Sequence, residues 1–318
     1  MKTLKLLITL SVMLISNAQE KSVRFEENSY ATEGLTSMEE GIITSNMVNG
    51  VITAFKNNVI LLETFLDDWE PEHKIMGMNY HERSQRVFFV SPNYMNGSIL
   101  SFDARHIHRM NSIMFKDRFI KVHIIDAGTL NDLKSNTTHL YVSNSSPFDG
   151  KVLGFEIEEL LEQQSREVLP EDVLISEIDF ANGLYIDNEN LLVVSTLEKV
   201  VYKINLENKS KEVFLTLENG WPDDIIRVNS SYVISDNENG RLYITDHSGK
   251  RLRTVKITTE SGLRVTPANL IYHKGRVYMS NLWKANTVNV LYSDITGNDI
   301  NDYRHGIYSI KAHDLLYK

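Results

Sequence analysis

The sequence predicts an all-β protein, a six-bladed β-propeller with four-stranded blades. The main observation is a recurring phrase: a polar residue enters a short apolar strand, and a polar turn and a second strand follow. The clearest copies span residues 181–194, 220–236 and 266–280. Their polar residues Asn182, Asp223 and Asn269 are taken as equivalent and lie 41 and 46 residues apart, about the length of one four-stranded blade.

The second observation is that earlier segments repeat the same alternation of apolar stretches with turns rich in Gly, Asn, Asp and Ser. These segments supply three further blades, expected within residues 32–62, 75–102 and 128–156, which makes six. A β-sandwich is the competing architecture. Its strand spacing of roughly 8–12 residues would not explain a phrase that returns after so long an interval.

Three segments are expected outside the clear repeats. Residues 157–165 form the only convincing helical pattern, a short element that ends ahead of Pro170. The strand Gly306–Ile310 can close the ring with the first or the last blade, and residues 19–29 can close it from the other end. The sequence leaves open which terminus supplies the closing strand.

The first 18 residues are interpreted as a cleaved secretory signal. Lys2 and Lys5 precede an apolar run, and small residues around Ala18 suit a cleavage site. A buried helix or a membrane anchor is the alternative, but the run is shorter than the roughly 20 residues that a spanning helix needs. Residues 19–318 are therefore expected to be one domain, secreted, or periplasmic in a bacterium, with no membrane span.

Net charge and composition narrow the classes of molecule that the protein is expected to bind. The formal net charge of −9 becomes −11 once residues 1–18, with two lysines, are removed. Binding to a phosphate backbone depends on clustered Lys and Arg, so we expect no nucleic acid partner and favour cations. The chain has no cysteine, which excludes thiolate metal sites, cysteine nucleophiles and disulfides.

Five Asn-x-Ser/Thr triplets are candidate glycan acceptors if the organism is eukaryotic, although an Asn-rich chain also contains such triplets by chance. They begin at Asn96, Asn136, Asn144, Asn208 and Asn229. Each lies in a polar segment beside a predicted strand.

Oxygen-bearing side chains stand at the entrances of the expected inner strands. They are Glu33, Asn131, Asn182, Asp223 and Asn269, with Asp132 and Asp224 beside two of them. In a propeller these entrances converge on the central axis, and carboxylate and amide oxygens suit calcium. Zinc is disfavoured because no His occurs in the phrase. The alternative is that these are turn residues bonded to their own backbone.

The motifs Thr32-Glu33-Gly34-Leu35, Leu130-Asn131-Asp132, Ala181-Asn182-Gly183-Leu184 and Pro222-Asp223-Asp224 resemble the calcium-binding positions of the paraoxonase (arylesterase) family. They also resemble those of the related gluconolactonases of the senescence-marker-protein-30 type. The resemblance implies a six-bladed propeller that hydrolyses lactones or esters and holds calcium with Glu33, Asn131, Asn182, Asp223 and Asp224. It also implies that Asp223 serves in catalysis, as the carboxylate that prepares the attacking water.

The chain departs from this family pattern at several points. Paraoxonases have a His-Gly pair in blade two where this chain has Met76-Gly77. Their second, structural calcium uses an Asp where this chain has Gly34, and their cysteine pair is absent. These departures keep open a non-catalytic propeller that binds a ligand or protein on its top face. A strictosidine-synthase-like propeller is disfavoured, since no residue signals that chemistry.

The roles of four other side chains stay open. Met76 and Met78 are expected either to line an apolar pocket or to fill a blade core. Trp221 and Trp283 are expected either to wall a substrate cleft or to be buried at blade junctions. His81 is expected in a surface turn.

Overall fold

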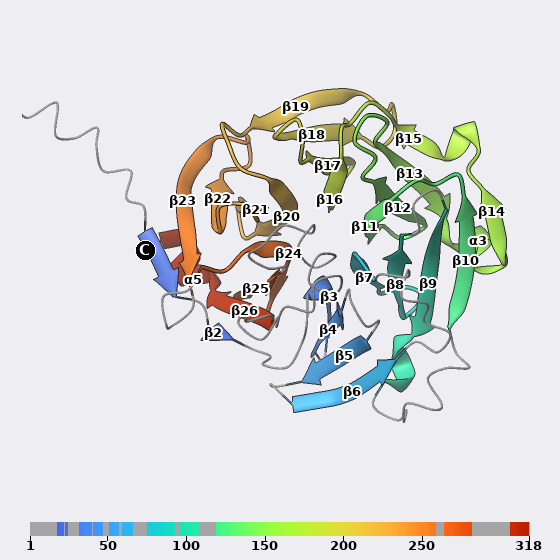
Figure 1. The fold of residues 1–318 in the computed structure, drawn as a ribbon, viewed down its shortest axis with the longest axis horizontal. Helices are drawn as coiled ribbons and strands as arrows, with labels where there is room; N and C mark the ends of the chain where they lie inside the picture. The colour runs from blue at the N-terminus through green and yellow to red at the C-terminus, as the bar shows by residue number, and fades with distance from the viewer. Residues whose placement is uncertain are drawn as a thin grey trace, which may run out of the picture.

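The structure is a computed structural model that describes residues 18–21, 23–24, 32–39, 41–46, 51–56, 59–65, 75–92, 96–107, 119–258, 264–281 and 306–317. Within these residues six small sheets follow one another around a ring, as Figure 1 shows. The predicted six-bladed β-propeller is confirmed. The predicted signal segment lies outside the described residues except for Ala18, and so does Trp283.

The first three blades follow the chain from its N-terminal part. Blade one contains β3 (Thr32–Met38), β4 (Gly41–Asn46), β5 (Val51–Lys56) and β6 (Val59–Phe65). Blade two contains β7 (Met78–His81), β8 (Arg86–Ser91), β9 (Gly97–Asp103), β10 (Ile120–Ile125) and β14 (Ser165–Glu167), with the short 3-10 helix η1 (Ala104–His106) after β9. Blade three contains β11 (Leu130–Ser135), β12 (His139–Asn144), β13 (Lys151–Glu156) and β15 (Val173–Ile175), and the 3-10 helix η2 (Pro170–Asp172) precedes β15.

The last three blades contain the clearest copies of the phrase. Blade four contains β16 (Ala181–Asp187), β17 (Asn190–Ser195), β18 (Val200–Asn205) and β19 (Lys211–Thr216). Blade five contains β20 (Pro222–Val228), β21 (Ser231–Asp236), β22 (Arg241–Thr245), β23 (Arg251–Thr258) and β1 (Ala18–Lys21). Blade six contains β24 (Pro267–His273), β25 (Arg276–Asn281), β26 (Gly306–Lys311) and β2 (Val23–Arg24).

Tight turns after the inner strands explain the regular spacing of the hairpins. Asn188 and Asn229 have φ values of 56° and 57°, and Lys274 and Gly275 have 45° and 78°. Positive φ at the tip suits two-residue hairpin turns, and Asn and Gly adopt it at the lowest cost. The innermost hairpin of blades four, five and six is therefore set by local sequence.

Both termini close the ring. β2 pairs antiparallel with β26, so blade six has three strands from the C-terminal part of the chain and a fourth from the N-terminal part. β1 adds to the outer edge of blade five, parallel to β23. The sequence left open which terminus supplies the closing strand, and the structure shows that both termini contribute strands to blade six.

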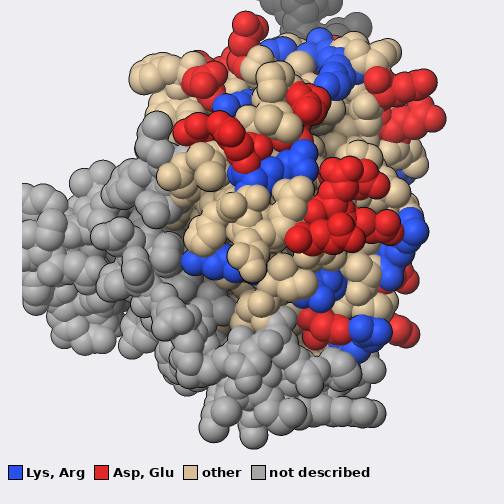
Figure 2. Space-filling view, turned by 90° about the vertical axis from the view of Figure 1, so that its right-hand side faces the viewer, with Lys and Arg blue, Asp and Glu red and all other residues tan. Residues whose placement is uncertain are grey.

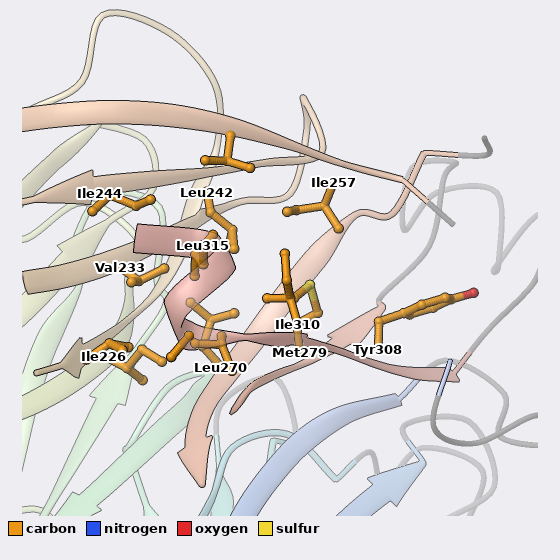
Figure 3. Packing of buried hydrophobic residues seen from close by; sticks show 14 of the residues in the cluster. Ile226, Val233, Leu242, Ile244, Ile257, Leu270, Met279, Tyr308, Ile310 and Leu315 are labelled. Atoms are coloured by element: carbon orange, nitrogen blue, oxygen red, sulfur yellow. The ribbon is translucent and has the colours of Figure 1, made fainter. Parts of the chain in front are cut away.

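Buried apolar side chains form six groups, one at each interface between neighbouring blades. Figure 3 shows the group between blades five and six, where Ile257 of β23, Ile310 of β26 and Met279 of β25 lie close together. Leu315 comes from the C-terminal helix α5 (Ala312–Tyr317), which the sequence analysis did not anticipate. Burial between blades, rather than within one sheet, therefore holds the ring.

Two expectations about individual elements need correction. The helix α3 covers only Ile157–Leu161 of the predicted 157–165, because Ser165–Glu167 instead pairs as β14 with the edge of β10. His81 is not in a surface turn: its side chain is 5% exposed and lies edge-on to Phe88. The strand β7 carries His81 into the blade before the following turn begins.

The outer surface of the ring is mixed in charge. Figure 2 shows basic side chains standing between acidic ones on the side that carries α3 and β14. Of the five glycan-acceptor triplets, the one at Asn144 starts at a side chain that is only 2% exposed. Its Oδ1 accepts a hydrogen bond from Ser146, so the folded protein does not offer it for modification. No helix in the described ranges is long and apolar enough to cross a membrane.

Candidate functional site

The recurring phrase coincides with a β-bulge at the start of the inner strand. In β20 the residues Asp223 and Asp224 together oppose the single residue Ser235 of β21. The same irregularity occurs in β3, β11, β16 and β24. We call the two residues the first and second bulge residues. The first are Glu33, Asn131, Asn182, Asp223 and Ala268, and the second are Gly34, Asp132, Gly183, Asp224 and Asn269.

Blade two carries Met76 and Gly77 at the corresponding places, just ahead of β7. Met78 pairs with Phe89 where the bulge ends in the other blades, and Gly77 N donates to Asn131 O of the next blade at 2.7 Å. Met76 is half-buried against the apolar group between blades two and three, and Met78 is fully buried between blades one and two. The two methionines therefore pack at the interfaces between blades.

The register corrects the equivalence that the sequence suggested. Pro267 pairs with Asn281, as Pro222 pairs with Asp236. Ala268 is therefore the equivalent of Asp223 in the repeat, and Asn269 is the equivalent of Asp224. The spacing of the last repeat is therefore 45 residues rather than 46. Blade six offers no polar side chain as its first bulge residue.

Asn182 and Asp223 come together across the interface between blades four and five. Asn182 Nδ2 donates to Asp223 Oδ1 at 2.5 Å and to Thr196 Oγ1 at 3.1 Å. Asn237 Nδ2 donates to Asp223 Oδ2 at 3.0 Å. The carboxylate of Asp223 is thus held by one amide at each oxygen.

Burial dominates the electrostatics of Asp223, whose side chain is 7% exposed. Burial, with smaller contributions from the charges of Asp132 and Asp236, raises its pKa to about 6, although the hydrogen bonds from Asn237 and Asn182 lower it. A carboxyl with such a pKa changes protonation close to neutral pH, as suits an acid-base group.

The second bulge residues connect neighbouring blades. Asp132 Oδ2 accepts Leu184 N of blade four at 2.9 Å, and Asp224 Oδ2 accepts Leu270 N of blade six at 2.7 Å. Asp224 Oδ1 also accepts Ile225 N at 2.8 Å. These carboxylates therefore join blade three to four and blade five to six.

Glycine as the second bulge residue makes room for the aspartates of the following blade. A Cβ on Gly183 would lie 2.4 Å from Asp224 Cα, and one on Gly77 would lie 2.5 Å from Asp132 Cα. Contacts that short are essentially never found for real side chains, so both positions require glycine. The aspartates at 132 and 224 thus depend on glycines one blade earlier.

Four serines complete the pattern, and sequence reasoning missed them. Each accepts the backbone N–H of a second bulge residue 11 positions earlier, in the pairs Gly34–Ser45, Asp132–Ser143, Asp224–Ser235 and Asn269–Ser280. The signal was present, because each of these serines ends an apolar strand and is followed by Asn or Asp. A search for this Ser-Asn/Asp pair would have fixed the register.

Lys134 lies beside these carboxylates. Its Nζ donates to Asp132 Oδ1 at 2.9 Å and to Oδ2 at 2.8 Å. Burial lowers its pKa, but the charges of Asp132 and Asp224 outweigh burial, so the net pKa is raised. Burial also raises the pKa of Asp224, to about 8, against the opposing effect of the Lys134 charge.

The polar side chains at the entrances of the inner strands meet several requirements of a calcium ion. The predicted ligands Glu33, Asn131, Asn182 and Asp223 are all first bulge residues and are at most 7% exposed. Asn131 Oδ1 is buried with no hydrogen-bond partner in the part of the chain that the structure describes. An oxygen in that state is suited to a cation, so the donor set is compatible with calcium.

Two further observations refine the ligand set. Both carboxylate oxygens of Asp224, the fifth predicted ligand, accept backbone N–H groups. Asp224 would therefore bind calcium through the lone pairs that remain on these oxygens. Among the described residues no three His, Asp or Glu side chains form a group that could hold a metal ion. The amides of Asn131 and Asn182 are therefore needed for a site here.

Comparisons with known proteins give the fold. No protein-family model matches the chain, and no curated protein matches it. Solved structures that resemble it include a luciferin-regenerating enzyme, with a TM-score of 0.63 and 13% identity over 92% of this chain and 94% of that one. A protein provisionally described as a gluconolactonase has a TM-score of 0.57 and 14% identity over 93% and 94% of the two chains. A chain from a nidogen–laminin complex has a TM-score of 0.55 and 11% identity over 74% and 83%. At these identities the likeness establishes the propeller fold alone.

Proposed function

We propose that this protein is a secreted, calcium-dependent hydrolase of lactones or esters. The observation that carries the proposal is the placement of Asp223, a buried carboxylate held by the amides of Asn182 and Asn237 at the entrance of an inner strand. Two solved neighbours, one described as a gluconolactonase and one as a luciferin-regenerating enzyme, support it as analogues of the same fold.

The ion would be held by Glu33, Asn131, Asn182 and Asp223, with Asp224 as the fifth predicted ligand. Calcium supplies a Lewis acid that polarises the substrate carbonyl oxygen. Both amide hydrogens of Asn182 are engaged, by Asp223 and Thr196, which leaves its Oδ1 for a cation.

Asp223 is the group we assign to proton transfer. Its carboxylate accepts a proton from the attacking water, as a general base positioned at the entrance of the inner strand. Asn182 and Asn237 fix the plane of the carboxylate by donating to opposite oxygens. The donated bonds also stabilise its ionised form before the reaction.

Two apolar side chains suit a substrate with an apolar part. Trp221 is 49% exposed and directly precedes Pro222, and Leu197 is 47% exposed and directly follows Thr196. Thr196 Oγ1 donates to Pro222 O at 2.7 Å, so the two side chains flank one hydrogen bond beside Asp223. Trp221 is thus not buried at a blade junction and is exposed enough to contact a substrate.

The test is hydrolysis of a panel of γ-lactones, δ-lactones and aryl esters by the purified chain from Gln19 onward. We expect turnover in calcium, loss of turnover after chelation, and recovery when calcium is restored. Turnover that is indifferent to chelation would refute the calcium-dependent mechanism.

A non-catalytic propeller is the second candidate, favoured by Met76 at the place of the paraoxonase-like His. It predicts calcium binding without turnover of any lactone or ester, in protein shown to be folded. The nidogen–laminin neighbour illustrates that a propeller fold occurs in a protein complex. Retained calcium binding with no hydrolysis would favour this function over the first.

A further inference from the structure

Lys134 is a basic side chain inside an acidic region. Its side chain is 15% exposed and that of Asp132 is fully buried, and the ammonium contacts both carboxylate oxygens at 2.9 and 2.8 Å. A buried carboxylate without a compensating charge is strongly unfavourable. The ammonium of Lys134 therefore supplies the counter-charge that Asp132 requires.

The second bulge residues of blades five and six, Asp224 and Asn269, also carry oxygen donors. Asp224 lies near enough for its charge to act on both Asp132 and Lys134. Asn269, the second bulge residue of blade six, is 5% exposed, and its Oδ1 has no hydrogen-bond partner within the described ranges. Two carboxylates and an unsatisfied amide oxygen are donors of the kind that hold calcium.

We infer that the Lys134 ammonium is a built-in cation beside Asp132, which stands in for a metal ion there and keeps exchangeable calcium away from that carboxylate. The inference about stoichiometry rests on the proposed calcium site at Glu33, Asn131, Asn182 and Asp223. The role of Lys134 as an internal cation rests on its own contacts. Removing its charge should open a second cation site at Asp132.

The test counts bound calcium by equilibrium dialysis in wild type, Lys134→Gln, Lys134→Arg and the control Lys203→Gln. Lys203 pairs with Glu212 at 3.1 Å on the exposed outer face. We expect Lys134→Gln to bind one calcium more per chain than wild type, and Lys134→Arg and Lys203→Gln to match wild type. Calcium should also raise the melting temperature of Lys134→Gln more than that of wild type.

An equal number of bound ions in wild type and Lys134→Gln would overturn the inference. Should Lys134→Gln fail to fold even in calcium while the double variant Asp132→Asn, Lys134→Gln folds, the inference is also overturned, because calcium did not replace the ammonium. If wild type binds no calcium, the proposed function fails. A gain of one ion in Lys134→Gln would still support the internal cation.

Discussion

Asp223 shows how one residue depends on its neighbours for both charge and orientation. Its environment is assembled from different blades, since Asn182 belongs to β16 and Asn237 follows β21. Residue type and repeat phase sufficed to select Asp223 and Asn182 from the sequence. Asn237 has no counterpart in the phrase, so only the fold reveals it.

The first prediction concerns Asp223→Asn. The substitution keeps the shape of the side chain but removes the proton acceptor and the negative charge, so we expect hydrolysis to fall by roughly 10²–10⁴-fold. Steady-state kinetics on the best lactone or ester would measure it. Asp187→Asn is the matched control, because Asp187 ends the inner strand β16 and is bonded to Arg227 at 2.9 Å. Full activity in Asp223→Asn would remove Asp223 from the mechanism.

The second prediction concerns His81 and pH. Burial lowers the pKa of His81, so the unfolded chain binds the proton more tightly than the folded one. The resulting stability is complete above the ordinary histidine pKa of about 6.5 and is lost as pH falls toward the folded value. We expect His81→Gln to show a smaller drop in melting temperature than wild type when the pH is lowered from about 7 to about 5, across the range in which histidine titrates.

The control for this prediction is His247→Gln, since His247 is exposed on a turn after β22. Its substitution should leave the pH dependence of the melting temperature as in wild type. An identical pH profile in wild type and His81→Gln would contradict the prediction.

At the scale of the element, the bulge decides which side chains meet. Five inner strands repeat it, and its two residues serve different purposes: the first supplies donors at the strand entrance, and the second joins the blades. The sequence predicted the strands well because apolar runs and turn residues are local signals. It placed Asn269 one residue out of phase because the repeats were matched by residue type, and blade six carries its polar side chain at the second bulge position rather than the first.

The third prediction concerns Gly183→Ala. The added Cβ would lie 2.4 Å from Asp224 Cα and 2.5 Å from Asp223 O, so backbone must move to accept it. We expect a loss of about 1–3 kcal/mol in the free energy of unfolding, from overpacking, measured by urea denaturation. The control is Gly154→Ala in β13, where the nearest atoms would be 3.4 Å away. Equal stability of the two variants would show that Gly183 is not required by packing.

At the scale of the whole molecule, each blade buries its faces against two neighbours. Six apolar groups lie between six blades, so the ring has no free face once blade six meets blade one. The recurrence of the phrase at the length of one blade made this architecture predictable from sequence. The partners of β1 and β2 were not predictable, because pairing between chain ends leaves no periodic signal.

The fourth prediction concerns ring closure. A chain that begins at Phe25 lacks β2, which leaves the edge of β26 unpaired and weakens the closing blade. We expect a lower melting temperature and more aggregation than in a chain that begins at Gln19. A chain that begins at Ser22 lacks β1 but keeps β2 and serves as the control, with a smaller loss. Calorimetry and light scattering measure both, and equal losses would mean that β2 does not close the ring.

The pairing of β2 with β26 has a consequence for the order of events during synthesis. A ribosome makes Val23 and Arg24 nearly 300 residues before their partners Ser309 and Tyr308. Blades one to five can form one after another as the chain emerges, whereas the N-terminal strand stays unpaired until the last strand is made. Pairing of β2 with β26 would therefore come last, and it would mark the completed ring.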